Sequence, residues 1–308
     1  MDNYTVKKKN NQELISKIKK HISESSLELI EQCGSFLEMY SNKELDKKKL
    51  KTANFCKNRF CPMCNWRKSK KDALKVSILM QYIKEELGLE FVFITLTAPN
   101  VKGEELEQEI REYTKAFSNL TKRKEFIKVN KGFVRKLEVT YNEENNTYHP
   151  HLHIIMAVNK SYFTDKTYIS KKKLLELWKE CKKDNTITQV DIKKVDTTDR
   201  KAILEIAKYS AKDSDYLKSQ EVFDVFYKAL KGKRLLTYTG VFKDAIDLFE
   251  EGKLDKYKEV DLTEYVYLIT YNWNKENAEY IVAELKELSE EEKRLVNKKL
   301  IEELEEDG

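Results

Sequence analysis

Three of the chain's four histidines, His149, His151 and His153, lie in one five-residue stretch. The overlapping run 152–158 is apolar and rich in branched side chains, which predicts a buried strand. Alternation along a strand directs the three imidazoles to one face, and two neutral imidazoles at this spacing can share a divalent metal ion. The alternative interpretation is a set of core or surface histidines without a metal.

A neighbouring strand offers a carboxylate as a third ligand. The segment 133–141 has the pattern of a strand, and the polar loop after it predicts an antiparallel hairpin with the histidine strand. If Tyr141 pairs with Tyr148, Glu138 faces His151, and directly opposed side chains have Cβ atoms within about 5 Å of each other. A cross-strand salt bridge from Glu138 to a lysine is the alternative.

The donor set indicates which ion would bind. His151, His153 and Glu138, with open coordination positions, suit Mn²⁺ or Mg²⁺ bound to a phosphate, whereas histidines alone would also accept zinc. His149 is a less favoured ligand of the same ion.

Four cysteines form a second predicted metal site. Cys56, Cys61 and Cys64, with Cys33 upstream, offer the four thiolates that a closed structural Zn²⁺ site needs. Four buried free thiols are the alternative. Cys181 lies on a separate predicted helix and is expected in the core.

The same region is strongly basic. Residues 47–71 contain ten Lys or Arg residues and no acid, whereas the whole chain has a net charge of only +5. A zinc knuckle in such a segment, with a tryptophan that can stack on bases, predicts a module that binds DNA phosphates. The predicted DNA contacts are Lys57, Arg59, Trp66, Arg67, Lys68, Lys70 and Lys71.

A carboxylate, a phenol and an ammonium fall on one side of a predicted helix at 198–212. Glu205, Tyr209 and Lys212 have the spacing of one helical face. A phenol with a pKa of about 10 becomes a nucleophile only when a metal polarises the phosphate under attack and a cation stabilises the developing charge. A tyrosine that only packs or lies at the surface is the alternative.

The order of expected elements predicts an α+β fold, with an antiparallel sheet and helices on one face. We expect a basic zinc-binding region at 1–88, a core at 89–232, and a C-terminal region at 233–308 made of a strand and an amphipathic helix at 277–306. The absence of a long apolar run or a signal peptide favours a cytoplasmic protein that does not enter a membrane.

In combination, these motifs resemble those of the replication initiators of rolling-circle plasmids, within the endonucleases with a histidine-hydrophobe-histidine (HUH) motif and a catalytic tyrosine. Residues 93–97, 149–153 and 205–212 resemble the family's first strand, metal motif and tyrosine helix, in that order. The cysteine segment is similar to that of the staphylococcal-type branch with a single active tyrosine.

The resemblance implies site-specific nicking and strand transfer at the double-strand origin of a plasmid. Tyr209 would attack a phosphodiester, leaving a 5′-phosphotyrosyl link and a 3′-hydroxyl that primes the host polymerase. His151 and His153 would hold the ion, Lys212 would neutralise charge, and Glu205 would activate water at termination.

Two residues depart from the family's pattern: His149 is a rival ligand and Tyr216 a rival nucleophile. The expected partners are origin DNA, both double-stranded and as a single-stranded nick site, and the host helicase and polymerase; a homodimer is left open. The alternative functions are a related transposase or relaxase, or a non-enzymatic zinc-dependent DNA-binding regulator.

Overall fold

The computed structural model describes residues 1–208 and 210–304, which form two compact units. The terminal unit comprises residues 1–70 together with the chain from residue 258 onwards, and the central unit comprises residues 71–257. No helix within the described ranges is long and apolar enough to cross a membrane.

The central unit is a mixed α+β structure that begins inside a long helix, α3 (Pro62–Leu87). Its further elements are β3 (Leu89–Thr97), α4 (Leu106–Thr121), α5 (Lys124–Val129), β4 (Gly132–Asn142), β5 (Thr147–Asn159), η2 (Lys160–Phe163), α6 (Lys171–Lys182), β6 (Val190–Val195), α7 (Arg200–Ala207), α8 (Asp213–Tyr216), α9 (Gln220–Leu230), β7 (Leu236–Tyr238), α10 (Val241–Glu250) and η3 (Asp255–Tyr257).

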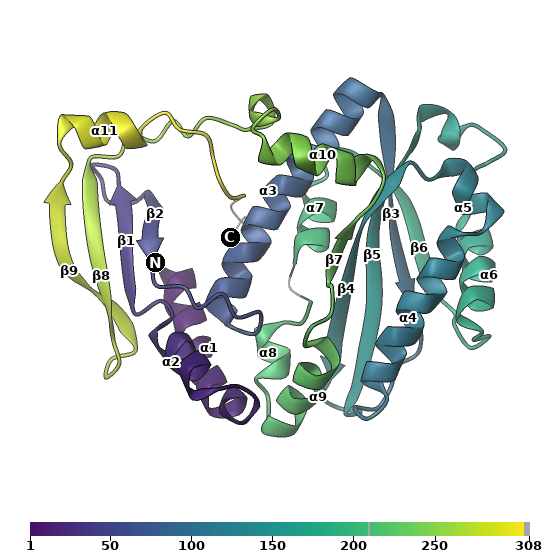
Figure 1. Ribbon diagram of the computed structural model, residues 1–308, viewed down its shortest axis with the longest axis horizontal. Helices are drawn as coiled ribbons and strands as arrows, with labels where there is room; N and C mark the ends of the chain where they lie inside the picture. The colour runs from purple at the N-terminus through teal and green to yellow at the C-terminus, as the bar shows by residue number, and fades with distance from the viewer. Residues whose placement is uncertain (209, 305–308) are drawn as a thin grey trace. The chain divides into compact units, whose positions relative to one another are not determined.

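Five antiparallel strands form the sheet of this unit, in the order β6-β3-β5-β4-β7 (Figure 1). The central strand β5 carries the histidines, and its apolar run is buried on both faces, as expected for a strand covered on both sides. Strand β3 starts directly after Gly88, whose φ of 63° ends α3.

Helices pack on both faces of the sheet. The two long helices that link successive strands, α4 and α6, pack against each other on one face. Helices α7 and α10 lie on the opposite face, where the Phe242 ring lies 6.0 Å from that of Phe91. The histidine side chains point to this second face, so α7 lies beside them.

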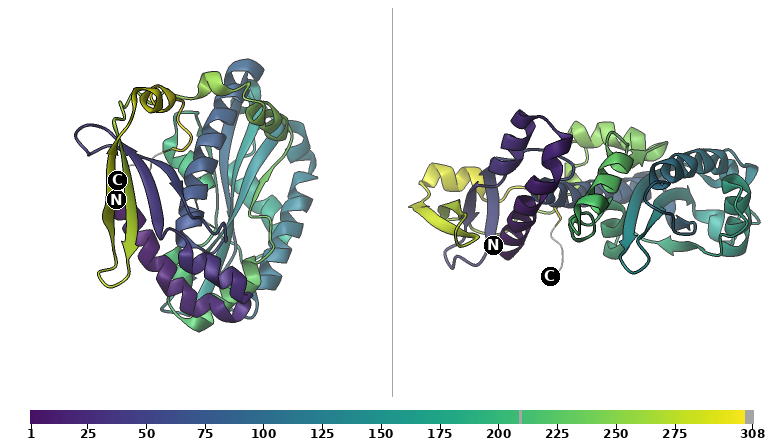
Figure 2. Two further views of the ribbon diagram at one scale, coloured as in Figure 1. Left: turned by 60° about the vertical axis from the view of Figure 1, so that its left-hand side comes forward. Right: turned by 90° about the horizontal axis from the view of Figure 1, so that it is seen from below.

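The terminal unit joins the first and last parts of the described chain in one sheet. Its elements are α1 (Asp2–Ile18), η1 (Lys19–His21), α2 (Glu24–Gln32), β1 (Phe36–Ser41), β2 (Lys48–Ala53), the start of α3, β8 (Tyr267–Asn274), β9 (Glu279–Glu287) and α11 (Glu290–Val296). The strand order is β2-β1-β8-β9, and Figure 2 shows the yellow-green β8–β9 hairpin beside the blue-purple strands.

This pairing corrects two sequence predictions. The predicted borders near residues 88 and 232 are replaced by a division at 70 and 258, because β8 pairs with β1 across more than 200 residues of sequence. The predicted helix at 277–306 is instead the edge strand β9 followed by the short helix α11. The charged side chains of this segment are as compatible with an exposed edge strand as with the solvated face of a helix, so their pattern did not distinguish the two.

Candidate functional site

The β4–β5 hairpin brings Glu138, His151 and His153 together. Tyr141 lies opposite Tyr148 and Glu138 lies opposite His151, in the register predicted from the sequence. Because side chains alternate along a strand, these three residues share one face of the sheet.

The three side chains converge on one point. Glu138 Oε2 lies 2.9 Å from His153 Nε2 and 3.3 Å from His151 Nε2, and the three ligand atoms all lie within 4.8 Å of one another. Two atoms that each lie about 2.1 Å from one ion, at octahedral to tetrahedral angles, are about 3.0–3.4 Å apart. The geometry therefore fits one divalent ion held by two imidazoles and a carboxylate.

The environment of Glu138 keeps its carboxylate ionised. Its side chain is 5% exposed. Burial raises the pKa of the Glu138 carboxyl, but the hydrogen bonds and charges of His151 and His153 outweigh burial and hold this pKa well below its usual range. The carboxylate is thus available as an anionic ligand.

Neighbouring residues orient the imidazoles. His153 Nδ1 lies 3.4 Å from Thr95 Oγ1 on β3, which helps to direct Nε2 toward the site. His149 lies beside the group, with its ring 5.0 Å from that of His151, and burial lowers the pKa of its imidazole. His149 does not belong to the set of converging ligand atoms found among the described residues.

A second carboxylate reaches the site from α7. Glu205 Oε1 lies 3.5 Å from His153 Nε2, and Glu205 Oε2 accepts a hydrogen bond from Lys208 Nζ at 2.6 Å. Glu205 is about a quarter exposed, at 26%. A carboxylate in this position can contact both the cluster of Glu138, His151 and His153 and solvent.

The predicted helix at 198–212 is shorter in the structure. Helix α7 ends at Ala207. The carbonyl of Ser210 accepts a hydrogen bond of 2.7 Å from the backbone N–H of Val139 on β4, so the chain here pairs with the sheet and does not continue the helix. The predicted nucleophile, Tyr209, lies outside the described residues.

This early end changes the interpretation of two further residues. Lys212 is exposed and directly precedes α8, so it does not share a helical face with Glu205 as predicted. Tyr216 is 1% exposed, and its ring packs against Phe223 and Phe226 at 6.2 and 6.3 Å. A side chain so deeply packed is a poor rival nucleophile.

One lysine on the face of the sheet that carries Glu138, His151 and His153 was not singled out from the sequence. Lys136 lies directly opposite His153 and two residues before Glu138, so it shares their face of the sheet. Its side chain is 6% exposed. The period-two pattern of β4 is the signal that could have identified it once Glu138 was chosen.

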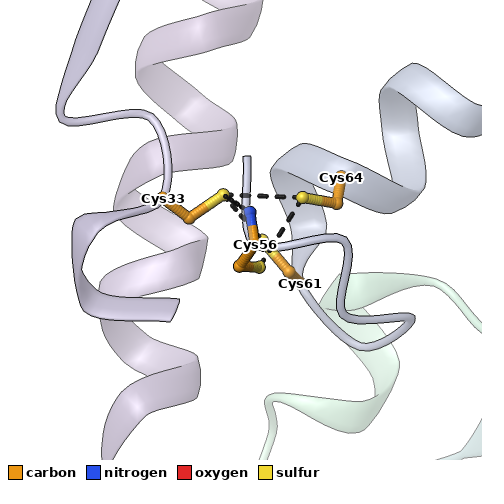
Figure 3. Close-up of side chains that lie close together, drawn as sticks. All are labelled: Cys33, Cys56, Cys61 and Cys64. Carbon is orange, nitrogen blue, oxygen red and sulfur yellow. Dashed lines mark hydrogen bonds between the residues drawn. The ribbon is translucent and has the colours of Figure 1, made fainter. Parts of the chain in front are cut away.

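The four predicted zinc ligands also come together, in the terminal unit (Figure 3). The Sγ atom of Cys33 lies 3.5 Å from that of Cys64 and 3.6 Å from that of Cys61, and Cys56 Sγ lies 3.6 Å from Cys64 Sγ. These separations exclude a disulfide, at about 2.05 Å, and approach the roughly 3.8 Å between thiolates about 2.3 Å from one tetrahedral Zn²⁺. Cys181 is buried on α6, as expected.

The predicted DNA-contacting residues divide into two groups. Four are exposed and able to meet a phosphate backbone: Lys57, Arg59, Lys68 and Lys71.

The other three are packed within the fold. Trp66 is 4% exposed and makes an edge-on contact with Tyr4 at 4.9 Å between ring centroids, which contradicts its predicted role in base stacking. Arg67 lies 3.3 Å from Glu303, and Lys70, 5% exposed, lies 3.8 Å from the same carboxylate. These residues hold α3 to other parts of the terminal unit.

Comparison with known proteins defines the family. A family model described as "Replication protein" matches residues 47–281. The chain belongs to this replication protein family. The chain is 52% identical over 218 residues to "Protein rep" of Staphylococcus aureus, covering 70% of this chain and 95% of that protein.

A second relative extends the comparison. Identity to "Protein rep" of Streptococcus pneumoniae is 39% over 228 residues, covering 72% of this chain and 71% of that protein. No solved structure matches the replication protein. Family membership confirms the resemblance to plasmid replication initiators.

Proposed function

We propose that this replication protein initiates rolling-circle replication by nicking one strand at a plasmid's double-strand origin and transferring that strand. The convergence of Glu138, His151 and His153 on one point supports the proposal. Glu138 Oε2 lies 2.9 Å from His153 Nε2 and 3.3 Å from His151 Nε2, and the carboxylate of Glu205 lies beside them. This donor set suits Mn²⁺ or Mg²⁺, which when bound polarises the scissile phosphate.

In the proposed first step Tyr209 is the nucleophile. Its phenolic oxygen forms a bond to phosphorus and the bond from phosphorus to the 3′ oxygen breaks. The phenolic proton is released and the 3′ oxygen takes up a proton, so the products are a 5′-phosphotyrosyl link and a 3′-hydroxyl. Both sequence neighbours of Tyr209 support this assignment: Lys208 contacts Glu205, and Ser210 bonds to β4 next to Glu138.

Cationic side chains would balance the charge of the phosphate. Lys136 lies on the metal-binding face opposite His153, whereas Lys212 is exposed on the loop before α8. We therefore assign the main charge-neutralising role to Lys136 and an outer role to Lys212. An ammonium in a buried site stabilises developing negative charge more than one in bulk water does.

Glu205 would act in the second half-reaction. Its carboxylate is partly exposed and lies next to the triad, so it can accept a proton from a water molecule that attacks the second phosphodiester. This reaction ends replication without a second covalent link to the protein.

The terminal unit would hold the origin DNA. Zn²⁺ bound by the four cysteines would fix the loop that carries the exposed Lys57 and Arg59, and Lys68 follows on α3. Origin DNA, and the host helicase and polymerase that act on the nicked product, are the partners that this activity requires.

A nicking assay on origin oligonucleotides tests the proposal. With Mn²⁺, the unchanged protein should cut one strand, His153→Ala should abolish cutting, and His21→Ala, which removes an imidazole from the terminal unit, should leave it unchanged. Full cutting by His153→Ala, or by any form in EDTA, would contradict a catalytic metal.

A further inference from the structure

A lysine lies buried next to the cysteine cluster. Lys8, on α1, is 2% exposed. Its Nζ donates hydrogen bonds to the carbonyl oxygens of Cys33 at 2.6 Å and Glu31 at 3.0 Å, and to Asn11 Oδ1 at 3.2 Å. All three donors of the ammonium are therefore used.

None of these acceptors carries a charge. Burying an ammonium costs several kcal/mol unless an opposite charge lies near, and no carboxylate in the described part of the chain pairs with Lys8. The hydrogen bonds to neutral oxygens pair the three N–H donors of Lys8 but do not compensate its positive charge.

The cysteine cluster can supply the missing negative charge. Four thiolates around one Zn²⁺ form a doubly negative centre, whereas four neutral thiols carry no charge. Lys8 contacts the backbone of Cys33, and its partner Asn11, which is fully buried, donates to Cys61 Sγ at 3.4 Å. The lysine and the amide thus connect α1 directly to two of the four ligand residues.

Backbone groups complete the surroundings of the sulfur atoms. The N–H of Cys56 lies 3.4 Å from Cys33 Sγ, and the N–H of Lys57 lies 3.2 Å from Cys64 Sγ. Donors aimed at sulfur stabilise thiolates more than thiols. The Asn11 amide and these two backbone N–H groups therefore suit an anionic cluster.

We propose that Lys8 is the buried counter-charge of a tetrathiolate metal site, so that metal loading and the docking of α1 stabilise each other. This inference rests on the zinc site of the proposed function and adds a positioning role for residues of α1.

The proposal makes α1 sensitive to the metal. Without the metal the four cysteines no longer form a doubly negative centre beside Lys8, so the docked state of α1 loses its electrostatic compensation. The packing of Leu14 and Ile18 and the contact of Tyr4 with Trp66 then still hold the helix. The N-terminal helix should open more often in the metal-free protein.

Zinc competition with a chelator measures the proposed effect on affinity. Lys8→Met keeps the length and apolar stem of the side chain, and Lys9→Met removes a charge from an exposed position on the same helix. We expect Lys8→Met to weaken zinc binding about 10- to 100-fold, as for other partners of metal ligands, and Lys9→Met to change it less than about twofold.

Hydrogen exchange on the unchanged protein provides a test that does not depend on a variant folding. Removal of zinc should increase amide exchange in α1 and leave exchange in α4 and α6 of the central unit unchanged. Equal zinc affinity in Lys8→Met and Lys9→Met, or unchanged protection of α1 without zinc, would overturn this inference alone. An unchanged protein that binds no zinc would overturn the cysteine site itself and this inference with it.

Discussion

Replacing Glu138 with glutamine keeps the size of the side chain and removes its charge, so the change tests the carboxylate as a metal ligand. A bound ion stabilises the folded protein by RT ln(1 + [M]/Kd), about 2.7 kcal/mol at an Mn²⁺ concentration of 100 Kd. Each kcal/mol shifts the Tm of a domain of this size by about 2–4 °C. We therefore expect Mn²⁺ to raise the Tm of the unchanged protein by about 5–11 °C.

The variant should respond much less. Glu138 Oε2 lies within 3.3 Å of both imidazole nitrogens, so its loss removes one of three converging ligands. Loss of a group that only supports a ligand costs about 10- to 100-fold in affinity, and loss of a ligand should cost at least the upper value. The same Mn²⁺ concentration then equals the Kd, and the stabilisation falls to about 0.4 kcal/mol, or about 1–2 °C.

Differential scanning fluorimetry across an Mn²⁺ titration measures this difference. Glu144→Gln removes an exposed carboxylate from the turn of the same hairpin and should keep the full Tm shift. If Glu138→Gln shows the same shift as Glu144→Gln, the carboxylate does not bind the ion and the assignment of the third ligand is refuted.

Three further predictions concern the roles of Lys136, Trp66 and Glu205. Lys136→Met should lower the nicking rate about 100-fold or more, and by more than Lys212→Met; the reverse order in single-turnover assays would return the charge-neutralising role to Lys212. Trp66→Ala should lower the free energy of unfolding, measured by urea denaturation, by about 3–5 kcal/mol. If the variant instead keeps normal stability and no longer binds DNA, Trp66 stacks on bases and is not a core residue. Glu205→Ala should still nick but yield replication products longer than one unit length, which a complete block of the first nick would exclude.

The cluster of Glu138, His151 and His153 could be predicted because its determinants are local in sequence. A short polar loop joins two strands of clear period, so the pairing of Tyr141 with Tyr148 fixes Glu138 opposite His151. The convergence of the four cysteines was also predictable from their number and spacing, although Cys33 lies far from Cys64 along the chain.

Features that depend on distant pairing could not be predicted. Helix α7 ends early because Ser210 bonds to Val139 of β4, a contact that no local pattern reveals. The acidic segment after residue 277 forms β9 because β8 offers it a partner. Trp66 is buried because α1 supplies Tyr4 as a packing partner. A tryptophan that the basic sequence around it suggests would stack on bases is therefore part of the core.

The proposed function requires that Tyr209 joins the protein to DNA during a metal-dependent nick. Incubation with Mn²⁺ and an origin oligonucleotide, followed by proteolysis and mass spectrometry, identifies the residue that carries the nucleotide. We predict a single adduct on Tyr209, lost in Tyr209→Phe with little change in Tm. An adduct on another residue such as Tyr216, or nicking that persists in Tyr209→Phe, would contradict the account.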